Sequence, residues 1–201
     1  MEYVAHLQKD KKLAPAITTP YHELKLHKNI PLHLMASIMS QQLNTKVADI
    51  IYRRFLEIYD KEEPTPEQVL ATPPETLRAI GLSNAKVGYV HNVARFCIEN
   101  AITDTKLLAL SDGEVITLLT KIKGVGQWTV EMLLMFTLGR QDIFAVDDLG
   151  LQNAVVKLYA IRTKDKKKLK ERLVKISAKW SPYRTYACLH LWRWKDNVPV
   201  V

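Results

Sequence analysis

Helix start signals recur along the whole chain, and they constrain its fold more than any other feature of the sequence. Thr65-Pro66-Glu67-Gln68 and Ser111-Asp112-Gly113-Glu114 each place a hydroxyl residue at an N-cap, with Gln or Glu three positions later. Thr72-Pro73-Pro74-Glu75 has the same order, and Ser83 precedes a helical pattern that runs to about residue 100. No segment alternates apolar and polar residues for the length of a founding strand. The sequence therefore predicts an all-α fold.

Length and composition narrow the class of protein further. The 201 residues suit one domain or two small ones that share a core. Apolar residues make up 47% and charged residues 25%, which excludes wholesale disorder. Cys97 and Cys188 are too few for a disulfide framework or a four-cysteine iron–sulfur cluster. Because neither a signal core nor a run of 18 apolar residues is present, we expect an intracellular protein that does not enter a membrane.

Positive charge is concentrated near the C-terminus. The chain carries 29 Lys and Arg against 21 Asp and Glu, a net charge of +8. Residues 157–196 hold thirteen of the bases and three of the acids. A Lys-rich run is most often a solvated helix face, but an excess gathered in one segment favours a surface that meets phosphates. Lys157, Lys179 and Arg184 are the candidates for such nonspecific contacts.

A glycine hairpin is the first candidate binding element. Lys123-Gly124-Val125-Gly126 joins a helix that ends near residue 122 to a second that runs from Gln127 to 138. Glycine permits a positive φ and close backbone approach. The Gly124 and Gly126 amides, together with the helix N-terminus, would form an anion site for one DNA phosphate. Taken alone, a Gly-x-Gly between helices is more often only a turn.

Two adjacent acids follow the hairpin. Ala145-Val146-Asp147-Asp148-Leu149-Gly150-Leu151 places them between an apolar segment and another helix. One acid is expected to be the N-cap, and the other can point into a cleft. The helix dipole favours the anionic carboxylate at this position.

Five segments in this order resemble the helix-hairpin-helix DNA glycosylase superfamily, most closely its DNA-3-methyladenine glycosylase II branch. They are Ile38–Leu43, Gly81–Lys86, Gly124–Thr129, Val146–Leu151 and Tyr183–Trp192. The resemblance implies two helical lobes without an iron–sulfur cluster, and an active site in the cleft between them. Residues 1–34 would form the N-terminal part of the first lobe, 35–138 a helical barrel with the hairpin at 118–138, and 139–201 a C-terminal part that packs with the N-terminal segment.

The resemblance also implies roles for individual residues. Asp148 matches the catalytic acid, which would stabilise the sugar cation or activate water, and Asp147 would be structural. Trp128 stands where strand-cleaving members carry a Schiff-base lysine, so we expect a monofunctional enzyme. Gln42 matches the wedge residue that fills the space left by a flipped base, and Leu43 is the second candidate. A purely structural role, in helix capping or core packing, is equally compatible with either residue.

The remaining implied sites concern the base and the phosphates. Trp128, Met132, Trp192 and Tyr186 match base-pocket positions, although each tryptophan can equally be a core residue. The segment Lys123-Gly124-Val125-Gly126 would bind phosphate. No cofactor and no side-chain metal site is expected, but the hairpin backbone carbonyls can hold a cation when DNA is bound.

The implied function is excision of alkylated purines, such as 3-methyladenine and 7-methylguanine, from damaged double-stranded DNA. The base would be flipped out and its N-glycosidic bond hydrolysed. We expect a monomer that works in the cytoplasm or nucleoid of a bacterium, or in the nucleus of a eukaryote. The alternatives are a glycosylase for an oxidised or deaminated base, a non-catalytic helix-hairpin-helix DNA-binding protein, and a basic helical domain that binds RNA or protein.

Overall fold

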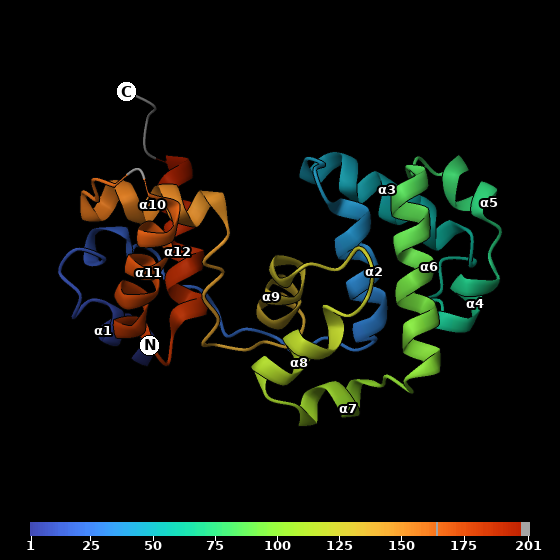
Figure 1. The fold of residues 1–201 in the computed structure, drawn as a ribbon, viewed down its shortest axis with the longest axis horizontal. Coiled ribbons are helices and arrows are strands. Elements are labelled where there is room, and N and C mark those ends of the chain that lie inside the picture. The colour runs from blue at the N-terminus through green and yellow to red at the C-terminus, as the bar shows by residue number, and fades with distance from the viewer. Residues whose placement is uncertain (164, 198–201) are drawn as a thin grey trace. The chain divides into compact units, whose positions relative to one another are not determined.

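The structure is a computed structural model that describes residues 1–163 and 165–197. Within these residues it contains α-helices and short 3-10 helices and no strand, which confirms the predicted all-α fold. The chain forms two compact units (Figure 1). We call Met1–Lys25 together with Gly139–Val201 the terminal unit, and Leu26–Leu138 the central unit.

The terminal unit is built from both ends of the chain. Its long C-terminal helices pack with one another and with the short N-terminal elements (Figure 1). Its core includes Trp180, which is fully buried and meets Phe144 edge-on at 5.5 Å between ring centroids. In chain order its elements are α1 (Glu2–Leu7), η1 (Ala14–Ala16), α10 (Leu149–Tyr159), α11 (Lys166–Ser177), η2 (Ala178–Trp180) and α12 (Arg184–Asn197).

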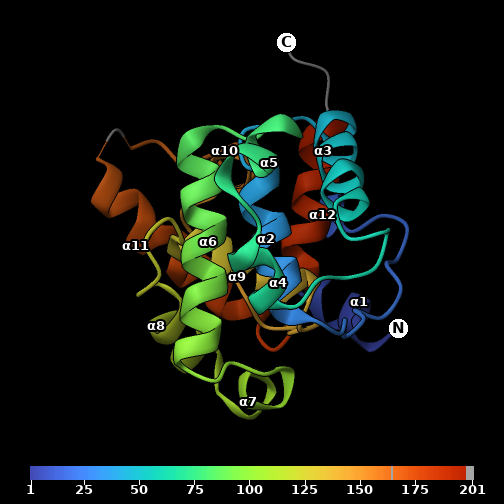
Figure 2. The ribbon, with the colours of Figure 1, turned by 90° about the vertical axis from the view of Figure 1, so that its right-hand side faces the viewer.

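The central unit is continuous in sequence. Its long helix α6 packs against α2 and α4, and the two views of Figures 1 and 2 agree on this arrangement. Helix α9 packs against α2 and α8. Its helices are α2 (Ile30–Ser40), α3 (Thr45–Glu57), α4 (Pro66–Ala71), α5 (Pro74–Ala79), α6 (Asn84–Glu99), α7 (Asp104–Ala109), α8 (Asp112–Leu119) and α9 (Gln127–Phe136).

The boundary between the units differs from the one expected after residue 34. That boundary would cut through α2, which is one continuous helix. Asn29 caps α2 through its side chain, and its own amide is bonded to Asp104 at 2.7 Å. The helix start is thereby tied to the central unit, and the division falls at Lys25–Leu26 instead.

Most of the predicted helix starts are present. Thr65 and Ser111 form complete capping boxes, and Ser83 caps α6. The prediction of Thr72 as an N-cap is wrong, because the helix begins at Pro74 with Pro73 at the cap position. Thr72 instead ends α4, where its hydroxyl bonds the Gln68 carbonyl at 2.9 Å.

Two further expectations concern the membrane and the cysteines. None of the helices in the described part of the chain combines the length and apolar character needed to span a bilayer. Both cysteines are buried free thiols, and burial raises the pKa of Cys97 to about 12. Each thiol therefore packs as a small hydrophobic group at neutral pH.

Candidate active site

Asp148 lies at the N-terminus of α10, and it is itself the N-cap of that helix. Its Oδ1 accepts a hydrogen bond from the Leu151 amide at 2.7 Å and another from Trp192 Nε1 at 3.1 Å. The side chain is half-buried. The two donors fix the orientation of the carboxylate.

Gly150 makes room for this arrangement. A Cβ at Gly150 would lie 3.1 Å from Asp148 Oδ1 and 3.5 Å from Trp192 Cδ1. A Cβ would therefore press on the carboxylate, whereas its contact with the indole would be an ordinary one. The sequence shows Gly150 only as part of a motif. The close approach of Trp192 to Gly150 depends on the packing of α10 against α12, which the sequence does not reveal.

Asp147 has a different environment from its neighbour. Its Oδ2 pairs with Lys170 Nζ of α11 at 2.7 Å, and both side chains are about half exposed. A surface pair of this kind contributes little stability. We expected one acid to cap the helix and the other to point into a cleft, but the capping residue is the catalytic candidate Asp148, and Asp147 forms the surface ion pair.

Trp192 and Tyr186 both lie on α12, but in different surroundings. Trp192 is partly exposed and orients Asp148 through its indole N–H. Tyr186 is only 4% exposed and stacks on Tyr3 at 4.0 Å between ring centroids. The structure therefore places Tyr186 in the aromatic core of the terminal unit. His190 lies in the same core, where burial lowers its pKa to about 4 and keeps the imidazole neutral at pH 7.

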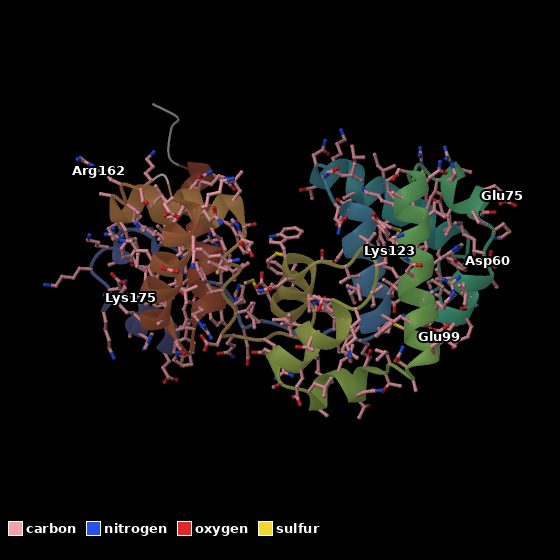
Figure 3. The ribbon with its side chains drawn as sticks, in the orientation of Figure 1. Asp60, Glu75, Glu99, Lys123, Arg162 and Lys175 are labelled. Carbon is pink, nitrogen blue, oxygen red and sulfur yellow. The ribbon has the colours of Figure 1, made fainter. Side chains whose placement is uncertain are left out.

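The hairpin lies in the central unit between α8 and α9. Gly124 has φ +102°, and a Cβ there would collide with the Tyr89 ring of α6. Its neighbour Lys123 is exposed beside α6 (Figure 3), and its carbonyl accepts a hydrogen bond from Asn92 Nδ2 at 3.1 Å. The conformation of this turn is thus set by α6, which the sequence pattern did not reveal.

The backbone amides of the hairpin are not equivalent. The Val125 amide bonds the Ile122 carbonyl at 3.0 Å, and the Val125 side chain is 5% exposed. The Val125 amide is therefore used within the turn, and the phosphate contact expected of Val125 stays a prediction. Within the described chain the amides of Gly124 and Gly126 donate no hydrogen bond. Gly126 is the N-cap of α9, and a Cβ there would meet no atom within 4 Å.

The wedge candidates lie in the turn between α2 and α3. Gln42 is exposed with φ +60°, and Leu43 is 37% exposed. Lys86 of α6 holds this turn, because its Nζ donates to the carbonyls of Met39 at 2.9 Å and Gln41 at 2.7 Å. Gln41 Nε2 also reaches Thr129 Oγ1 of α9 at 3.2 Å. The hydrogen bonds of Lys86 and Gln41 thus hold the backbone of this turn, and Gln42 and Leu43 are exposed on it.

The two base-pocket candidates on α9 also separate. Trp128, in the first turn, is 40% exposed. Met132, one turn later, lines a pocket of about 290 Å³ formed within the central unit. The other walls of this pocket, which we call the central pocket, come from α2, α3 and the C-terminal end of α9, and its lining comprises His33, Ala36, Ser37, Met39, Ser40, Ala48, Asp49, Tyr52, Met132, Phe136 and Thr137.

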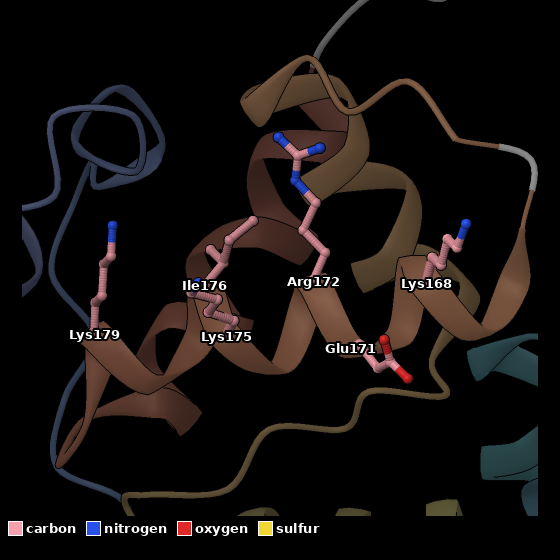
Figure 4. Close-up of a pocket in the computed structure, with 6 residues that line it drawn as sticks. All are labelled: Lys168, Glu171, Arg172, Lys175, Ile176 and Lys179. Carbon is pink, nitrogen blue, oxygen red and sulfur yellow. The ribbon is translucent and has the colours of Figure 1, made fainter.

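The basic segment contains cations of two kinds. Arg184 forms a two-point pair with Asp142, at 2.7 Å and 3.0 Å, so its guanidinium is already engaged. Lys157 lies 6.0 Å from the ring centre of Trp194. A hollow of about 470 Å³ along α11 and η2 (Figure 4) is lined by Glu171, Ile176 and four exposed cations. We call these four cations the α11 basic face: Lys168, Arg172, Lys175 and Lys179.

Comparison with known proteins gives consistent results. A family model described as "HhH-GPD superfamily base excision DNA repair protein" matches residues 35–179. DNA-3-methyladenine glycosylase 1 of Schizosaccharomyces pombe is 38% identical over 162 residues, which cover 80% of this chain and 70% of that protein. The putative DNA-3-methyladenine glycosylase YfjP of Bacillus subtilis is 33% identical over 166 residues, covering 80% of this chain and 57% of the relative.

A solved structure resembles the whole chain. It is the S. pombe 3-methyladenine DNA glycosylase Mag1 in complex with abasic DNA, with a TM-score of 0.85 and 31% sequence identity. The match covers 100% of each chain. In contrast, the chain spans just over half the length of the B. subtilis relative.

Proposed function

Because the chain belongs to the HhH-GPD superfamily of base excision DNA repair proteins and to its DNA-3-methyladenine glycosylase branch, we propose that it releases alkylated purines from double-stranded DNA. The substrates would include 3-methyladenine and 7-methylguanine. The observation that carries the proposal is the carboxylate of Asp148, held by Leu151 and Trp192 at the start of α10. The abasic DNA in the Mag1 complex is the kind of product that such a reaction leaves.

Asp148 would act on the sugar of the flipped nucleotide. Breaking the N-glycosidic bond builds positive charge on that sugar, and a carboxylate already fixed in place stabilises the charge without reorganisation. It can also orient the attacking water. Trp192 would act as a positioning residue, because its indole N–H holds the carboxylate oxygen.

The hairpin would hold one phosphate of the DNA backbone. The Gly124 and Gly126 amides and the N-terminus of α9 supply the donors, and Lys123 supplies charge. A cation bound with the DNA would sit on the hairpin carbonyls. These fit an ion because the Lys123 and Ile122 carbonyls, which each accept one hydrogen bond, keep a second lone pair.

The exposed turn at Gln42 would fill the space that the flipped nucleotide leaves. Unstacking a base costs a few kcal/mol, least for a damaged base. A side chain that enters the stack offsets part of that cost. The support of the turn by Lys86 and Gln41 suits this role, because a wedge must resist displacement.

Trp128 bears on strand cleavage. It occupies the position two residues after Gly126, and an indole cannot form a Schiff base with the sugar. We therefore expect a monofunctional enzyme that leaves an intact abasic strand. Such an enzyme works as a monomer where the genome lies, in the nucleoid of a bacterium or the nucleus of a eukaryote.

Base release from a methylated duplex tests the proposal. The protein is incubated with DNA that holds 3-methyladenine and 7-methylguanine, the released bases are quantified, and strand breaks are measured before and after the DNA is heated in alkali. We expect release of both bases, with strand breaks only after alkali. Tight, salt-sensitive binding without release of either base would contradict the proposal, and breaks before alkali would contradict the monofunctional mechanism.

A further inference from the structure

Helix α6 carries an ammonium group that is bound by backbone carbonyls of another helix. Lys86 is half-buried, and its Nζ donates to the carbonyl oxygens of Met39 at 2.9 Å and Gln41 at 2.7 Å. Burial lowers the pKa of Lys86, because the ammonium loses contacts with water. Both acceptors lie at the C-terminal end of α2, where the last carbonyls of a helix lack partners within it and attract a cation. Lys86 therefore caps α2.

The backbone directly after this cap has an uncommon conformation. We call residues 41–44, between α2 and α3, the wedge turn. Gln42 has φ +60°, in the left-handed region that residues other than Gly, Asn and Asp seldom adopt. Such a conformation persists only where the surrounding structure enforces it. The bond from Lys86 to the carbonyl of Gln41, the residue before Gln42, supplies part of that constraint.

The same helix also holds the hairpin. The ring of Tyr89 lies so close to Gly124 that an added Cβ would collide with it, and Asn92 Nδ2 donates to the Lys123 carbonyl at 3.1 Å. Lys86, Tyr89 and Asn92 are spaced three residues apart, so they lie along one side of α6. At 1.5 Å per residue, the first and the last are about 9 Å apart along the helix axis. A single helix thus sets the distance between the wedge turn and the hairpin.

A second connection joins the wedge turn to the hairpin. Gln41 Nε2 donates to Thr129 Oγ1 at 3.2 Å, and Thr129 lies in the first turn of α9, which follows the hairpin. Helix α2 packs against both α6 and α9. The side chains of Gln42 and Leu43 take no part in these connections and are exposed. The backbone of the wedge turn is therefore held, while its two outer side chains are accessible.

We propose that α6 fixes the wedge turn relative to the hairpin, and that Lys86 is a positioning residue for base flipping. The inference rests on the proposed function, since it assumes that the hairpin and the wedge turn meet one DNA duplex. While the hairpin holds a phosphate, a wedge at a fixed distance lies where the flipped base leaves a space. A wedge turn that moved independently would have to be ordered in each flipping event, which would weaken its effect.

Two duplexes that differ in the cost of flipping test this inference. One holds 7-methylguanine opposite cytosine, and the other holds the same lesion opposite adenine, a mismatch that is easier to unstack. Single-turnover base release is measured for the wild type, Lys86→Met and the matched control Arg95→Met. Methionine keeps an unbranched side chain and removes the N–H donors. Arg95, nine residues after Lys86, is exposed on the opposite side of the same helix.

We expect Lys86→Met to slow release from the paired duplex about tenfold and from the mismatched duplex about twofold or less. Arg95→Met should slow neither. Partial unfolding would slow both reactions by the same factor, so the ratio of the two rates reports on flipping alone. Lys86→Gln keeps an N–H donor and serves as the second variant if Lys86→Met does not fold, with a smaller change of the ratio. A ratio equal to that of the wild type in the folded variant overturns the inference.

A double-mutant cycle shows whether Lys86 acts through the wedge turn. The variant Gln42→Ala/Leu43→Ala removes both candidate wedge side chains. If Lys86 acts by positioning them, adding Lys86→Met to this variant leaves the ratio of the two rates unaltered. A further change of the ratio, by the same factor as in the wild-type background, would show that Lys86 acts elsewhere and would overturn the inference.

The proposed function fails by a different result. A 2-aminopurine beside the lesion brightens when its neighbour leaves the stack, so it reports flipping without base release. If Lys86→Met weakens this signal but even the wild type releases no base, the role of Lys86 stands and the glycosylase reaction does not. If both proteins release 7-methylguanine with the same ratio of rates, the reaction stands and the role of Lys86 is refuted.

Discussion

Replacing Gly150 with alanine tests whether the Asp148 carboxylate must stay where α10 holds it. The new Cβ would lie 3.1 Å from Asp148 Oδ1, so the carboxylate must yield by a few tenths of an ångström, whereas the 3.5 Å distance to Trp192 Cδ1 is an ordinary contact. A misplacement of 1 Å costs about 100-fold in rate. We therefore expect Gly150→Ala to slow base release about tenfold, with unchanged affinity for duplex DNA.

Gly113 provides the matched control for this substitution. Like Gly150 in α10, it is the second residue of its helix, α8, and a Cβ there would meet no atom within 4 Å. Alanine replaces glycine in a helix with a gain of roughly 0.5–1 kcal/mol in stability. Gly113→Ala should show that gain and a wild-type rate, whereas Gly150→Ala should gain less and lose rate.

Single-turnover release from a duplex with one 7-methylguanine measures the rate, and urea unfolding measures the stability. Equal rates for Gly150→Ala and Gly113→Ala would refute the argument that packing around Gly150 positions the carboxylate.

Three further results are expected. Gly124→Ala should lose about 1–3 kcal/mol of stability in urea unfolding, because the φ of Gly124 is positive and a Cβ there collides with Tyr89. Gly126→Ala should keep the stability of the wild type and weaken duplex binding in a filter assay. Equal effects of the two substitutions would contradict these different roles of the two glycines. The pKa of His190 is lowered to about 4 from an ordinary 6.5, so the unfolded chain binds more protons between these values and stability falls as the pH drops through that range. From pH 7 to pH 5 the loss is about 2 kcal/mol, and His190→Leu should remove this part of the pH dependence in denaturant titrations. Neutralising the α11 basic face with four glutamines should reduce the steepness of the salt dependence of DNA binding, and an unchanged slope would show that this face does not meet phosphates.

Local signals explain which features could be predicted from the sequence. A helix start depends on a few neighbouring residues, so the caps at Thr65, Ser83 and Ser111 follow from the pattern alone. The error at Thr72 is local as well. Two successive prolines allow the helix to begin at the second, and the Thr72 hydroxyl is used by the helix before it.

Features of the site that depend on distant residues were not predictable. The pattern placed Asp148 at a helix start, but its second hydrogen bond comes from Trp192, far along the chain. The resemblance predicts Tyr186 in the base pocket, whereas in the structure its ring stacks on Tyr3, a residue far away in the sequence. The sequence shows Lys86 only as part of a motif, because its two hydrogen bonds to the end of α2 depend on the packing of α6 against α2.

The most direct test of the account compares Asp148→Asn with Asp147→Asn. Asparagine keeps the shape of the side chain and an oxygen that can accept the hydrogen bond from the Leu151 amide, but it removes the negative charge. We predict that Asp148→Asn binds a 7-methylguanine duplex as the wild type does and loses most of its base release, whereas Asp147→Asn retains it. Base release by Asp148→Asn at the wild-type rate would contradict the central claim that this carboxylate carries the reaction.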